Sequence, residues 1–194
     1  SVKCYSALHG YALSIEYDDK FEECAVHKDK FFRRHCHIHR LMITEISEGD
    51  WMLFLDSDVG VVNPNRLVEE YIEEGYEIYL FDRFYNWEYA AQYMVKNNER
   101  GRDWVKQFAM FEFKLPHSFH GTDNGALHPL MLNYLVAEAS DPKRRSRLVD
   151  VCLSIWNSCS SYDDLFSMQA CTRMVIGERV HFPEQRVKIY QKVR

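Results

Sequence analysis

Blocks of hydrophobic and polar residues along the chain predict helices and strands in alternation. The clearest block is Trp51–Leu55, a continuous apolar run bounded by polar residues. A run this short suits a strand buried on both faces, although periodicity alone does not separate it from a buried helix. The alternation of helical and strand segments over the rest of the chain predicts an α/β fold.

Helical spacing and helix-ending residues mark the predicted helices, which cover 2–9, 28–48, a stretch from the turn at 63–65 to about 74, 101–112, 131–139 and 162–174. The predicted strands cover 12–17, 51–55, 77–81, 93–97 and part of 179–190. A loop is predicted over Pro116–Gly121. The basic stretch Lys143–Arg147 is interpreted as a solvated loop or the start of a helix.

Length and composition suit one globular domain, 1–194. The chain has 194 residues, of which 46% are apolar, enough to build a core. Its net charge of −5 argues against nucleic acid as the main partner, because nucleic-acid-binding faces are basic. The sequence has neither a signal peptide nor the roughly 20 consecutive apolar residues of a membrane helix. Membrane association is therefore expected only through an anchor outside this chain.

The cysteines leave two interpretations open. An oxidising compartment would pair them, but the sequence does not give the pairing; buried free thiols are the alternative. No CxxC zinc pattern is present. The six cysteines are Cys4, Cys24, Cys36, Cys152, Cys159 and Cys171.

The strongest local signal for chemistry is Asp56-Ser57-Asp58, directly after the apolar run. Carboxylates are hard oxygen ligands that suit Mg²⁺ or Mn²⁺. In an α/β sheet, ligands usually bind at the end of a strand. A divalent ion there would bridge the protein to a diphosphate and neutralise the charge that grows on the leaving phosphate. The motif is short, so a capped turn with two solvated acids is the alternative.

A second cluster of polar residues lies in Phe119–His128, where histidines, a carboxylate and an amide stand among glycines. Glycine lets a backbone approach a ligand closely. Asp123 is a candidate to bind an acceptor hydroxyl or to stabilise positive charge at a sugar carbon, and Asn124 to orient a substrate. The alternative is a turn in which these side chains only cap the following helix.

The third candidate is the basic segment Arg33–Arg40. His35 and His39 share a helix face, so a metal pair is one interpretation, although no further ligand completes it locally. Contact between a phosphate and Arg33, Arg34 or Arg40 is another, since the planar guanidinium can bond two oxygens. Ordinary surface and core positions are the third.

Several segments together resemble a nematode-expanded family of glycosyltransferase-like proteins whose function has long been unassigned. They are Trp51–Arg66, Phe81–Glu88 and Leu115–His128, together with the opening residues from Cys4 to Tyr11. That family is similar to the galactosyl/mannosyltransferases of the yeast Golgi and to the xyloglucan xylosyltransferases of plants. The resemblance runs from Lys3 to about Gly177 in matching order, which is more specific than any single motif.

The resemblance implies a GT-A-like (Rossmann-like) fold with a mixed central sheet flanked by helices. It also implies Mn²⁺ or Mg²⁺, a UDP- or GDP-sugar donor, and transfer of a hexose or pentose to a glycan or glycoprotein with retention of configuration. The implied location is the Golgi or ER lumen, as a type II membrane protein.

The same resemblance assigns roles to matching residues of this chain. Asp56 and Asp58 are expected to hold the metal, with Asp56 also touching the donor and Ser57 near its ribose. Arg34 or a near neighbour is expected to meet the diphosphate. Asp123 and Asn124 are expected to occupy the position of the family's acid–amide pair, which contacts the transferred sugar and the acceptor.

Three departures from the family pattern bear on activity. The usual Ala-Gly-Ser before the position of Tyr93 is Ala90-Ala91-Gln92 here, and the methyl of Ala91 is expected to narrow the sugar pocket. The relatives' first strand is not found ahead of the first helix. Their C-terminal metal-binding histidine has only a poor match in His181. The domain is therefore expected to be truncated at both ends.

Two other functions remain open at this stage. A degenerate transferase would bind a glycan or a partner without turnover, in line with Ala91 and the missing ends. A haloacid-dehalogenase-type phosphatase would use Asp56 as nucleophile and Asp58 as acid/base, with metal acids from Asp163-Asp164. Against the phosphatase, no apolar strand precedes that acidic pair, and the nucleophile strand lies far from the start of the domain.

Overall fold

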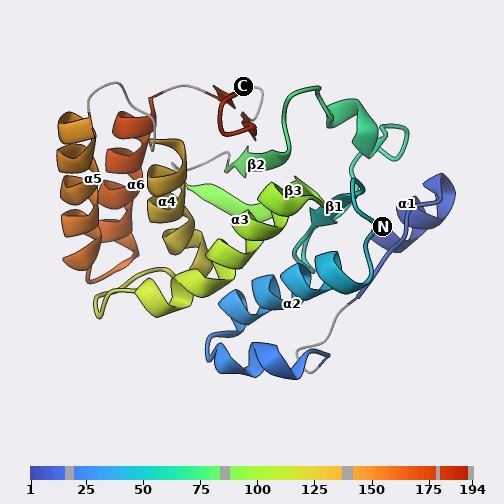
Figure 1. Cartoon of the computed structure of the whole chain (residues 1–194), viewed down its shortest axis with the longest axis horizontal. Coiled ribbons are helices and arrows are strands. Elements are labelled where there is room, and N and C mark those ends of the chain that lie inside the picture. The colour runs from blue at the N-terminus through green and yellow to red at the C-terminus, as the bar shows by residue number, and fades with distance from the viewer. Residues whose placement is uncertain (16–19, 84–87, 137–141, 178–179, 192–194) are drawn as a thin grey trace.

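The computed structural model describes residues 1–15, 20–83, 88–136, 142–177 and 180–191, with backbone only over 142–146 (Figure 1). Its α-helices are α1 (Val2–His9), α2 (Lys30–Thr44), α3 (Glu99–Met110), α4 (Thr122–Leu135), α5 (Pro142–Asn157) and α6 (Tyr162–Ile176). Its strands are β1 (Trp51–Phe54), β2 (Ile78–Asp82), β3 (Tyr89–Lys96), β4 (His181–Phe182) and β5 (Val187–Tyr190). Short 3₁₀ helices cover Glu22–Val26, Val68–Tyr71 and Phe111–Lys114.

The strands form one mixed five-stranded sheet in the order β1-β3-β2-β5-β4. Strands β2 and β5 are parallel, whereas the other three pairings are antiparallel. Helices pack against this sheet, so the predicted α/β fold with a mixed sheet flanked by helices is confirmed at that level.

The two faces of the sheet are covered differently. Residues alternate between faces along a strand, and Ile78 and Leu80 of β2 belong to the main hydrophobic core with α2, α3 and α4. Their neighbour Tyr79 faces the other way, stacked on Tyr190 with ring centroids 5.6 Å apart and close to Trp51. The helices therefore cover one face, and aromatic side chains cover much of the other.

Packing among the helices places α2 and α4 where the candidate site forms. Helices α2 and α3 lie side by side, α4 packs against β3 and α6, and α5 and α6 form a pair at the far end (Figure 1). Asp29 caps the start of α2, and its carboxylate accepts a hydrogen bond from the Phe31 N–H at 2.8 Å. Its buried residues Phe32, His35 and Ile38 recur at the spacing of one helix face.

Two disulfides tie pairs of neighbouring elements together. Cys24–Cys36 joins a 3₁₀ helix to α2, and Cys152–Cys171 joins α5 to α6. The cysteines outside these pairs are Cys4 and Cys159, both free. The interpretation of the cysteines as disulfides therefore holds for four of the six.

Several predicted elements differ from the structure. Residues 12–15 form no strand: Leu13 and Ile15 are exposed, so their alternation is not the sign of a buried face. Residues 16–17 lie outside the described residues. Strand β1 is an edge strand paired only with β3, and Leu53 is 36% exposed, so burial on both faces was wrong. Apolar composition shows that a strand packs, but not how many neighbours it has.

Other differences concern element boundaries. The helix expected to run to about Glu74 is only the 3₁₀ turn Val68–Tyr71. Helix α4 begins at Thr122, well before the predicted 131, and position 139 is not described. The last predicted strand is a hairpin of β4 and β5, with 179 not described. The basic stretch Lys143–Arg147 begins α5, so the helix-start interpretation is confirmed.

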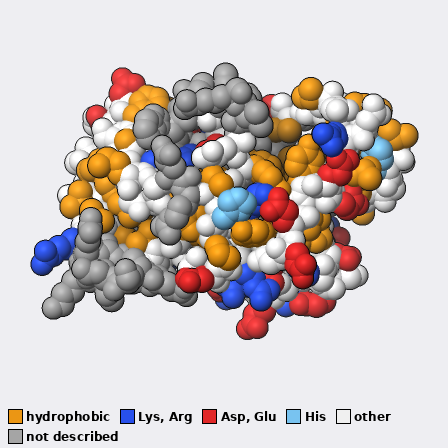
Figure 2. All heavy atoms as spheres, turned by 90° about the horizontal axis from the view of Figure 1, so that it is seen from above, with side chains coloured by type: hydrophobic (Ala, Val, Ile, Leu, Met, Phe, Trp, Pro, Cys, Tyr) orange, Lys and Arg blue, Asp and Glu red, His pale blue; other side chains and the backbone are white. Residues whose placement is uncertain are grey.

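Charged side chains are mixed on the surface. On the face shown in Figure 2, acidic and basic groups are interspersed with apolar ones. In the part of the chain that the structure describes, no helix is long and apolar enough to cross a membrane.

Candidate functional site

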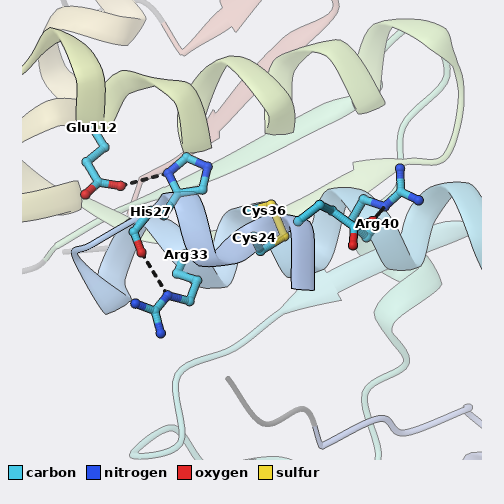
Figure 3. The surroundings of a disulfide bond; sticks show 7 residues. Cys24, His27, Arg33, Cys36, Arg40 and Glu112 are labelled. Atoms are coloured by element: carbon cyan, nitrogen blue, oxygen red, sulfur yellow. Dashed lines mark hydrogen bonds and ion pairs between the residues drawn. A yellow bond between two sulfur atoms is a disulfide. The ribbon is translucent and has the colours of Figure 1, made fainter. Parts of the chain in front are cut away.

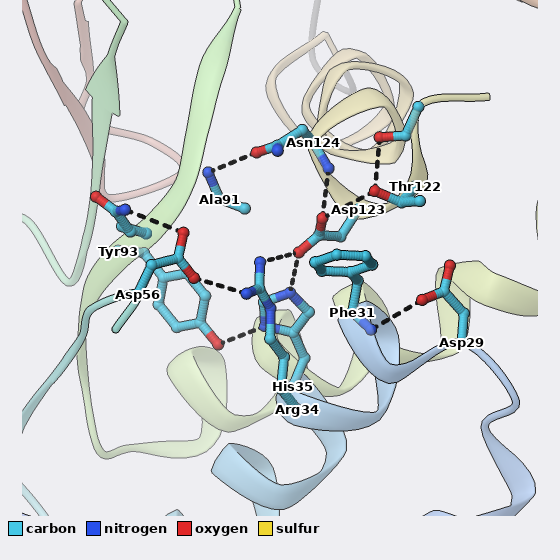
Figure 4. Close-up of polar contacts among 12 residues, drawn as sticks. Asp29, Phe31, Arg34, His35, Asp56, Ala91, Tyr93, Thr122, Asp123 and Asn124 are labelled. Carbon is cyan, nitrogen blue, oxygen red and sulfur yellow. Dashed lines mark hydrogen bonds and ion pairs between the residues drawn. The ribbon is translucent and has the colours of Figure 1, made fainter. Parts of the chain in front are cut away.

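Asp56 stands two residues beyond the end of β1 and holds two side-chain partners. Its Oδ1 accepts a hydrogen bond from Arg34 Nη1 at 2.6 Å, and its Oδ2 accepts one from Gln92 Nε2 at 3.1 Å (Figure 4). The β1–β3 register, in which Phe54 pairs with Tyr93, brings Gln92 next to the end of β1. The carboxylate is 24% exposed, so solvent still reaches it.

Arg34 links this carboxylate to a second one from another segment. Its Nη2 donates a hydrogen bond to Oδ2 of Asp123. The guanidinium carbon lies 5.3 Å from the centroid of the Phe31 ring and 5.2 Å from that of Phe54. Its Nε is buried without a hydrogen-bond partner. One guanidinium therefore spans two carboxylates while one of its own donors stays unused.

Asp123 lies in the first turn of α4, where the helix dipole favours a negative charge. Its side chain is fully buried, and its Oδ1 accepts hydrogen bonds from the N–H of Asn124 at 2.8 Å and from the Thr122 hydroxyl at 3.3 Å. Burial alone would raise the pKa of Asp123. The hydrogen bond from His35 and the charge of Arg34 more than offset burial, so the pKa is lowered and the group is a carboxylate.

His35 connects Asp123 to the interior of the protein. The ring is fully buried, with Nε2 3.2 Å from Asp123 Oδ2 and Nδ1 3.1 Å from the Tyr93 hydroxyl. Burial lowers the pKa of His35 and raises that of Tyr93 well above its usual value, so both groups are neutral. A carboxylate only accepts hydrogen bonds; Nε2 therefore donates to Asp123, and Nδ1 accepts from Tyr93. This chain fixes the carboxylate in orientation and charge.

The turn that carries Asp123 is strained and tightly packed. Gly121 and Thr122 both have positive φ, 67° and 55°, and a β-branched residue rarely adopts this conformation. A Cβ on Gly125 would stand 1.9 Å from the carbonyl oxygen of His120, and one on Gly121 would stand 2.5 Å from Leu165. Glycine was expected here to let a ligand approach. It instead lets the loop and α4 approach each other.

Asn124 is tied to the sheet in this structure. Its side-chain oxygen accepts a hydrogen bond from the N–H of Ala91 at 3.2 Å (Figure 4). Ala91 is only 1% exposed and belongs to the hydrophobic core. The methyl expected to narrow a sugar pocket is therefore buried in packing, next to a backbone donor that Asn124 occupies.

Ser57 and Asp58 follow Asp56 on an exposed turn. Among the described residues, neither side chain makes a hydrogen bond or ion pair. The described residues also contain no group of three or more His, Cys, Asp or Glu placed to hold a metal. Two carboxylates still suit Mg²⁺ or Mn²⁺, because these ions often take one or two protein carboxylates and complete their shell with substrate phosphates. The donor set thus fits a metal shared with a diphosphate.

The other residues of the basic segment point elsewhere. Arg33 Nε donates to the carbonyl of His27 at 2.9 Å, and Arg40 pairs with Glu23 at 2.6 Å, close to the Cys24–Cys36 disulfide (Figure 3). Among the three candidate arginines, Arg34 is the one that reaches the carboxylates. Both ring nitrogens of His35 are engaged, which contradicts its pairing with His39 as a metal site.

His181 is also far from the site. It lies on β4, at the opposite edge of the sheet from β1, and its Nδ1 is 3.0 Å from the Tyr76 hydroxyl. Strands in a sheet are spaced about 4.8 Å apart, so four spacings separate the two edges by roughly 19 Å. His181 therefore does not complete a metal shell around Asp56 and Asp58.

Sequence reasoning missed Gln92 and Tyr93 as partners of the site. Gln92 had been noted only as a departure from the family pattern, and Tyr93 only as an alignment position. The available signal was a polar residue inside a strand of otherwise apolar side chains. In such a strand, a polar group needs a partner.

The fold and this cluster define a mixed α/β protein in which α2, the end of β1 and the start of α4 bring an arginine to two carboxylates. A family model described as "Protein of unknown function, DUF273" matches residues 2–194, and the chain belongs to that family. No curated protein and no solved structure matches the chain significantly.

Proposed function

We propose that this protein is a metal-dependent glycosyltransferase with a GT-A-like domain. It transfers a hexose or pentose from a UDP- or GDP-sugar to a glycan or glycoprotein, with retention of configuration. One observation carries the proposal: Arg34 joins Asp56 to Asp123, although these acids lie in separate motifs. A carboxylate beside a strand end, an arginine and a second carboxylate are the groups needed to bind a metal–diphosphate and an adjacent sugar.

Each residue has a role in this proposal. Asp56 and Asp58 would hold Mn²⁺ or Mg²⁺, which would supply positive charge to the leaving diphosphate. Ser57 lies near the donor ribose, and Arg34 binds diphosphate oxygens. Asp123 and Asn124 begin α4 beside this arginine, where the proposal places the transferred sugar and the acceptor; the fully buried Asp123 carboxylate acts there by holding Arg34. His35 is a positioning residue, since it contacts only Asp123 and the interior.

The disulfides support folding in an oxidising compartment, which the proposal takes to be the Golgi or ER lumen; a membrane anchor outside this chain is part of the same proposal. Disulfides form and persist in oxidising compartments and are rare in the cytosol. Cys24–Cys36 and Cys152–Cys171 each have Cα atoms at bonding distance, 5.7 and 5.5 Å. Four of the six cysteines are thus paired as expected of a chain folded in such a compartment.

A degenerate transferase, which binds a glycan or partner without turnover, is the second candidate. The observation that favours it is the engagement of both oxygens of Asp56, by Arg34 and by Gln92. The phosphatase alternative has no such support. In the part of the chain that is described, Asp163-Asp164 form no metal group with Asp56 and Asp58, and Asp164 instead caps a turn at Ser160.

The test measures thermal stability and calorimetric binding with UDP and GDP, in Mn²⁺ or in EDTA. The variants are Asp58→Ala and, as a matched control, Glu74→Ala, an exposed acid away from the cluster. A ligand at 100 times its Kd stabilises the native state by about 2.7 kcal/mol. For a domain of this size that raises Tm by roughly 5–10 °C.

The proposal expects a rise in Tm that requires Mn²⁺, disappears in Asp58→Ala and persists in Glu74→Ala. Nucleotide binding that is unchanged in EDTA would contradict the metal role of the two acids. An assay of nucleotide-sugar hydrolysis or transfer then distinguishes an active transferase from a degenerate one. Metal-dependent binding without any turnover over a panel of UDP- and GDP-sugars would support the degenerate transferase.

A further inference from the structure

Arg34 already binds Asp56, one of the two acids of the proposed metal site. The charges at this point do not balance: one guanidinium faces two carboxylates, Asp56 and Asp123. His35, the other group in contact with Asp123, is neutral because burial lowers its pKa. One negative charge is therefore left unmatched within a partly buried cluster, which favours the entry of a cation and opposes the entry of a diphosphate alone.

The contacts of Arg34 allow it to change partners without leaving its place. Phe31 and Phe54 lie near its guanidinium at 5.3 and 5.2 Å. The hydrogen bonds to the carboxylates use the Nη atoms at the edge of the group. Arg34 is 23% exposed, and its Nε–H is buried without a partner. The guanidinium is thus held by aromatic rings while its donors are only partly satisfied.

We propose that Arg34 is an exchangeable counter-ion of the site. In the cation-free protein it is the shared partner of Asp56 and Asp123 and matches one of their two negative charges. A divalent cation that arrives with a nucleoside diphosphate displaces it from Asp56, and the released Nη atom then binds a diphosphate oxygen. Asp123, held by His35 and the first turn of α4, keeps its contact with Arg34 throughout.

This exchange rests on the proposed function, and it predicts an order of events. Metal alone binds weakly, because it must compete with Arg34 for Asp56. Nucleotide alone binds weakly, because the unmatched negative charge repels it. Metal and nucleotide together bind well. The metal matches the negative charge that repels the nucleotide, and the diphosphate gives the displaced Arg34 a new partner. Binding of metal and nucleotide is therefore coupled through one side chain.

The experiment measures the affinity for Mn²⁺ alone, by calorimetry and by the EPR signal of free Mn²⁺, in wild type, Arg34→Gln and Arg33→Gln. Arg33 is the matched control, since it is the preceding residue on α2 and contacts the His27 carbonyl instead. A hydrogen-bonded ion pair that is partly exposed contributes on the order of 1.4 kcal/mol, a factor of about ten in affinity. We expect Arg34→Gln to bind Mn²⁺ alone about tenfold more tightly than wild type, and Arg33→Gln to match wild type.

The same titrations with UDP or GDP present complete the test. In wild type, nucleotide should strengthen Mn²⁺ binding more than in Arg34→Gln, because the variant has lost the coupling. Equal Mn²⁺ affinity in wild type and Arg34→Gln, with nucleotide binding still dependent on Mn²⁺, would overturn the exchange and leave the proposed function standing. Absence of Mn²⁺ binding in all three proteins, with or without nucleotide, would overturn both.

A measurement on the wild-type protein covers the case in which Arg34→Gln fails to fold. The side-chain ¹⁵N signals of Arg34, assigned with Arg34→Lys, are followed on addition of Mg²⁺, of UDP, and of both. The exchange expects the largest change when both are present. Arg34 signals that remain at their cation-free positions in saturating Mg²⁺ and nucleotide would overturn it.

Discussion

Arg173 and Arg34 are both partly buried arginines paired with acids, but they are paired differently. Among the described residues, Arg173 directs its fork to one carboxylate, that of Asp82, with Nη1 3.3 Å from Oδ2 and Nη2 bonded to Oδ1. Its guanidinium also lies 3.8 Å from the centroid of the Tyr89 ring. Arg34 divides its fork between Asp56 and Asp123.

The difference separates a contact that holds the fold from one suited to binding. Within the part of the chain that the structure describes, the Arg173–Asp82 pair matches one positive charge with one negative charge and is 16% exposed on both sides, so an added cation gains nothing there. It joins α6 to the end of β2. The Arg34 cluster carries an unmatched negative charge at the meeting point of α2, β1 and α4. Charge balance, more than burial, distinguishes the two.

The largest expected effect comes from replacing each arginine by glutamine. Loss of Arg173 leaves Asp82 without its bidentate partner and removes the contact with Tyr89. Removal of one partner of a buried pair costs about 3 kcal/mol in the free energy of unfolding. Loss of Arg34 leaves Asp56 and Asp123 without their shared cationic partner and costs about 2 kcal/mol in the free energy of unfolding. Urea unfolding of both variants, in EDTA and in Mn²⁺, measures the difference.

Mn²⁺ should restore most of the stability of Arg34→Gln and none of that of Arg173→Gln. The ion supplies a positive charge in place of Arg34 only beside Asp56, which the proposal makes a metal ligand together with Asp58. Recovery of Arg173→Gln by Mn²⁺, or no recovery of Arg34→Gln, would remove the distinction between the two arginines.

A smaller effect is expected in the pH dependence of stability. His128 lies beside the Arg173 pair, stacked on Tyr89 at 5.0 Å, and its Nδ1 is buried without a partner. Burial, and then the charge of Arg173, lower its pKa to about 3. Below the unfolded-state pKa of roughly 6.5, the unfolded chain takes up a proton that the folded chain does not. Stability is therefore lost as pH falls from about 6.5, by up to 1.4 kcal/mol per pH unit.

His128→Gln removes this titration, so the variant should lose about 2 kcal/mol less than wild type between pH 6.5 and 4.5. His35→Gln is the comparison on the Arg34 side. His35→Gln should alter the loss of stability between these pH values less than His128→Gln does. The carboxylate of Asp123 favours the charged His35 ring and partly offsets the lowering of its pKa by burial. Urea unfolding at each pH measures the slopes. Parallel curves for wild type and His128→Gln would contradict the assignment of a neutral buried ring.

Part of this comparison was accessible from the sequence. The apolar run before Asp56 predicted a strand that ends in acids, and the polar residues around Asp123 left a turn that caps the following helix as the alternative to a ligand site. Both are local signals, since strand and turn preferences depend on neighbouring residues. The pairing of β1 with β3 alone depends on the fold as a whole, which local pattern does not encode.

The partners of Asp56 and Asp123 are not local. The residue pattern left three arginines of one segment open, and only the family resemblance pointed to Arg34 or a near neighbour. Packing of α2 in the fold brings Arg34 to Asp56, while Arg33 and Arg40 turn to other partners. The same holds for the disulfides, because six cysteines allow fifteen complete pairings. Only the packing of the 3₁₀ helix on α2 and of α5 on α6 decides among them.

The smallest effects are expected at the two acids of the proposed metal site, and they separate structural from binding roles. Asp56→Ala removes an ion pair with Arg34 and should cost about 1 kcal/mol in the free energy of unfolding, since Arg34 keeps Asp123 as a balanced partner. Asp58→Ala should change stability by less than about 0.5 kcal/mol, because its side chain is exposed. Both should abolish Mn²⁺-dependent nucleotide binding. The control is Asp82→Ala. We expect it to lower the free energy of unfolding about as much as Arg173→Gln does and to leave nucleotide binding intact. If Asp58→Ala unfolded the protein, Asp58 would have a structural role. If the variant left Mn²⁺-dependent nucleotide binding unchanged, Asp58 would not be a metal ligand, and the proposed site of two acids would be wrong.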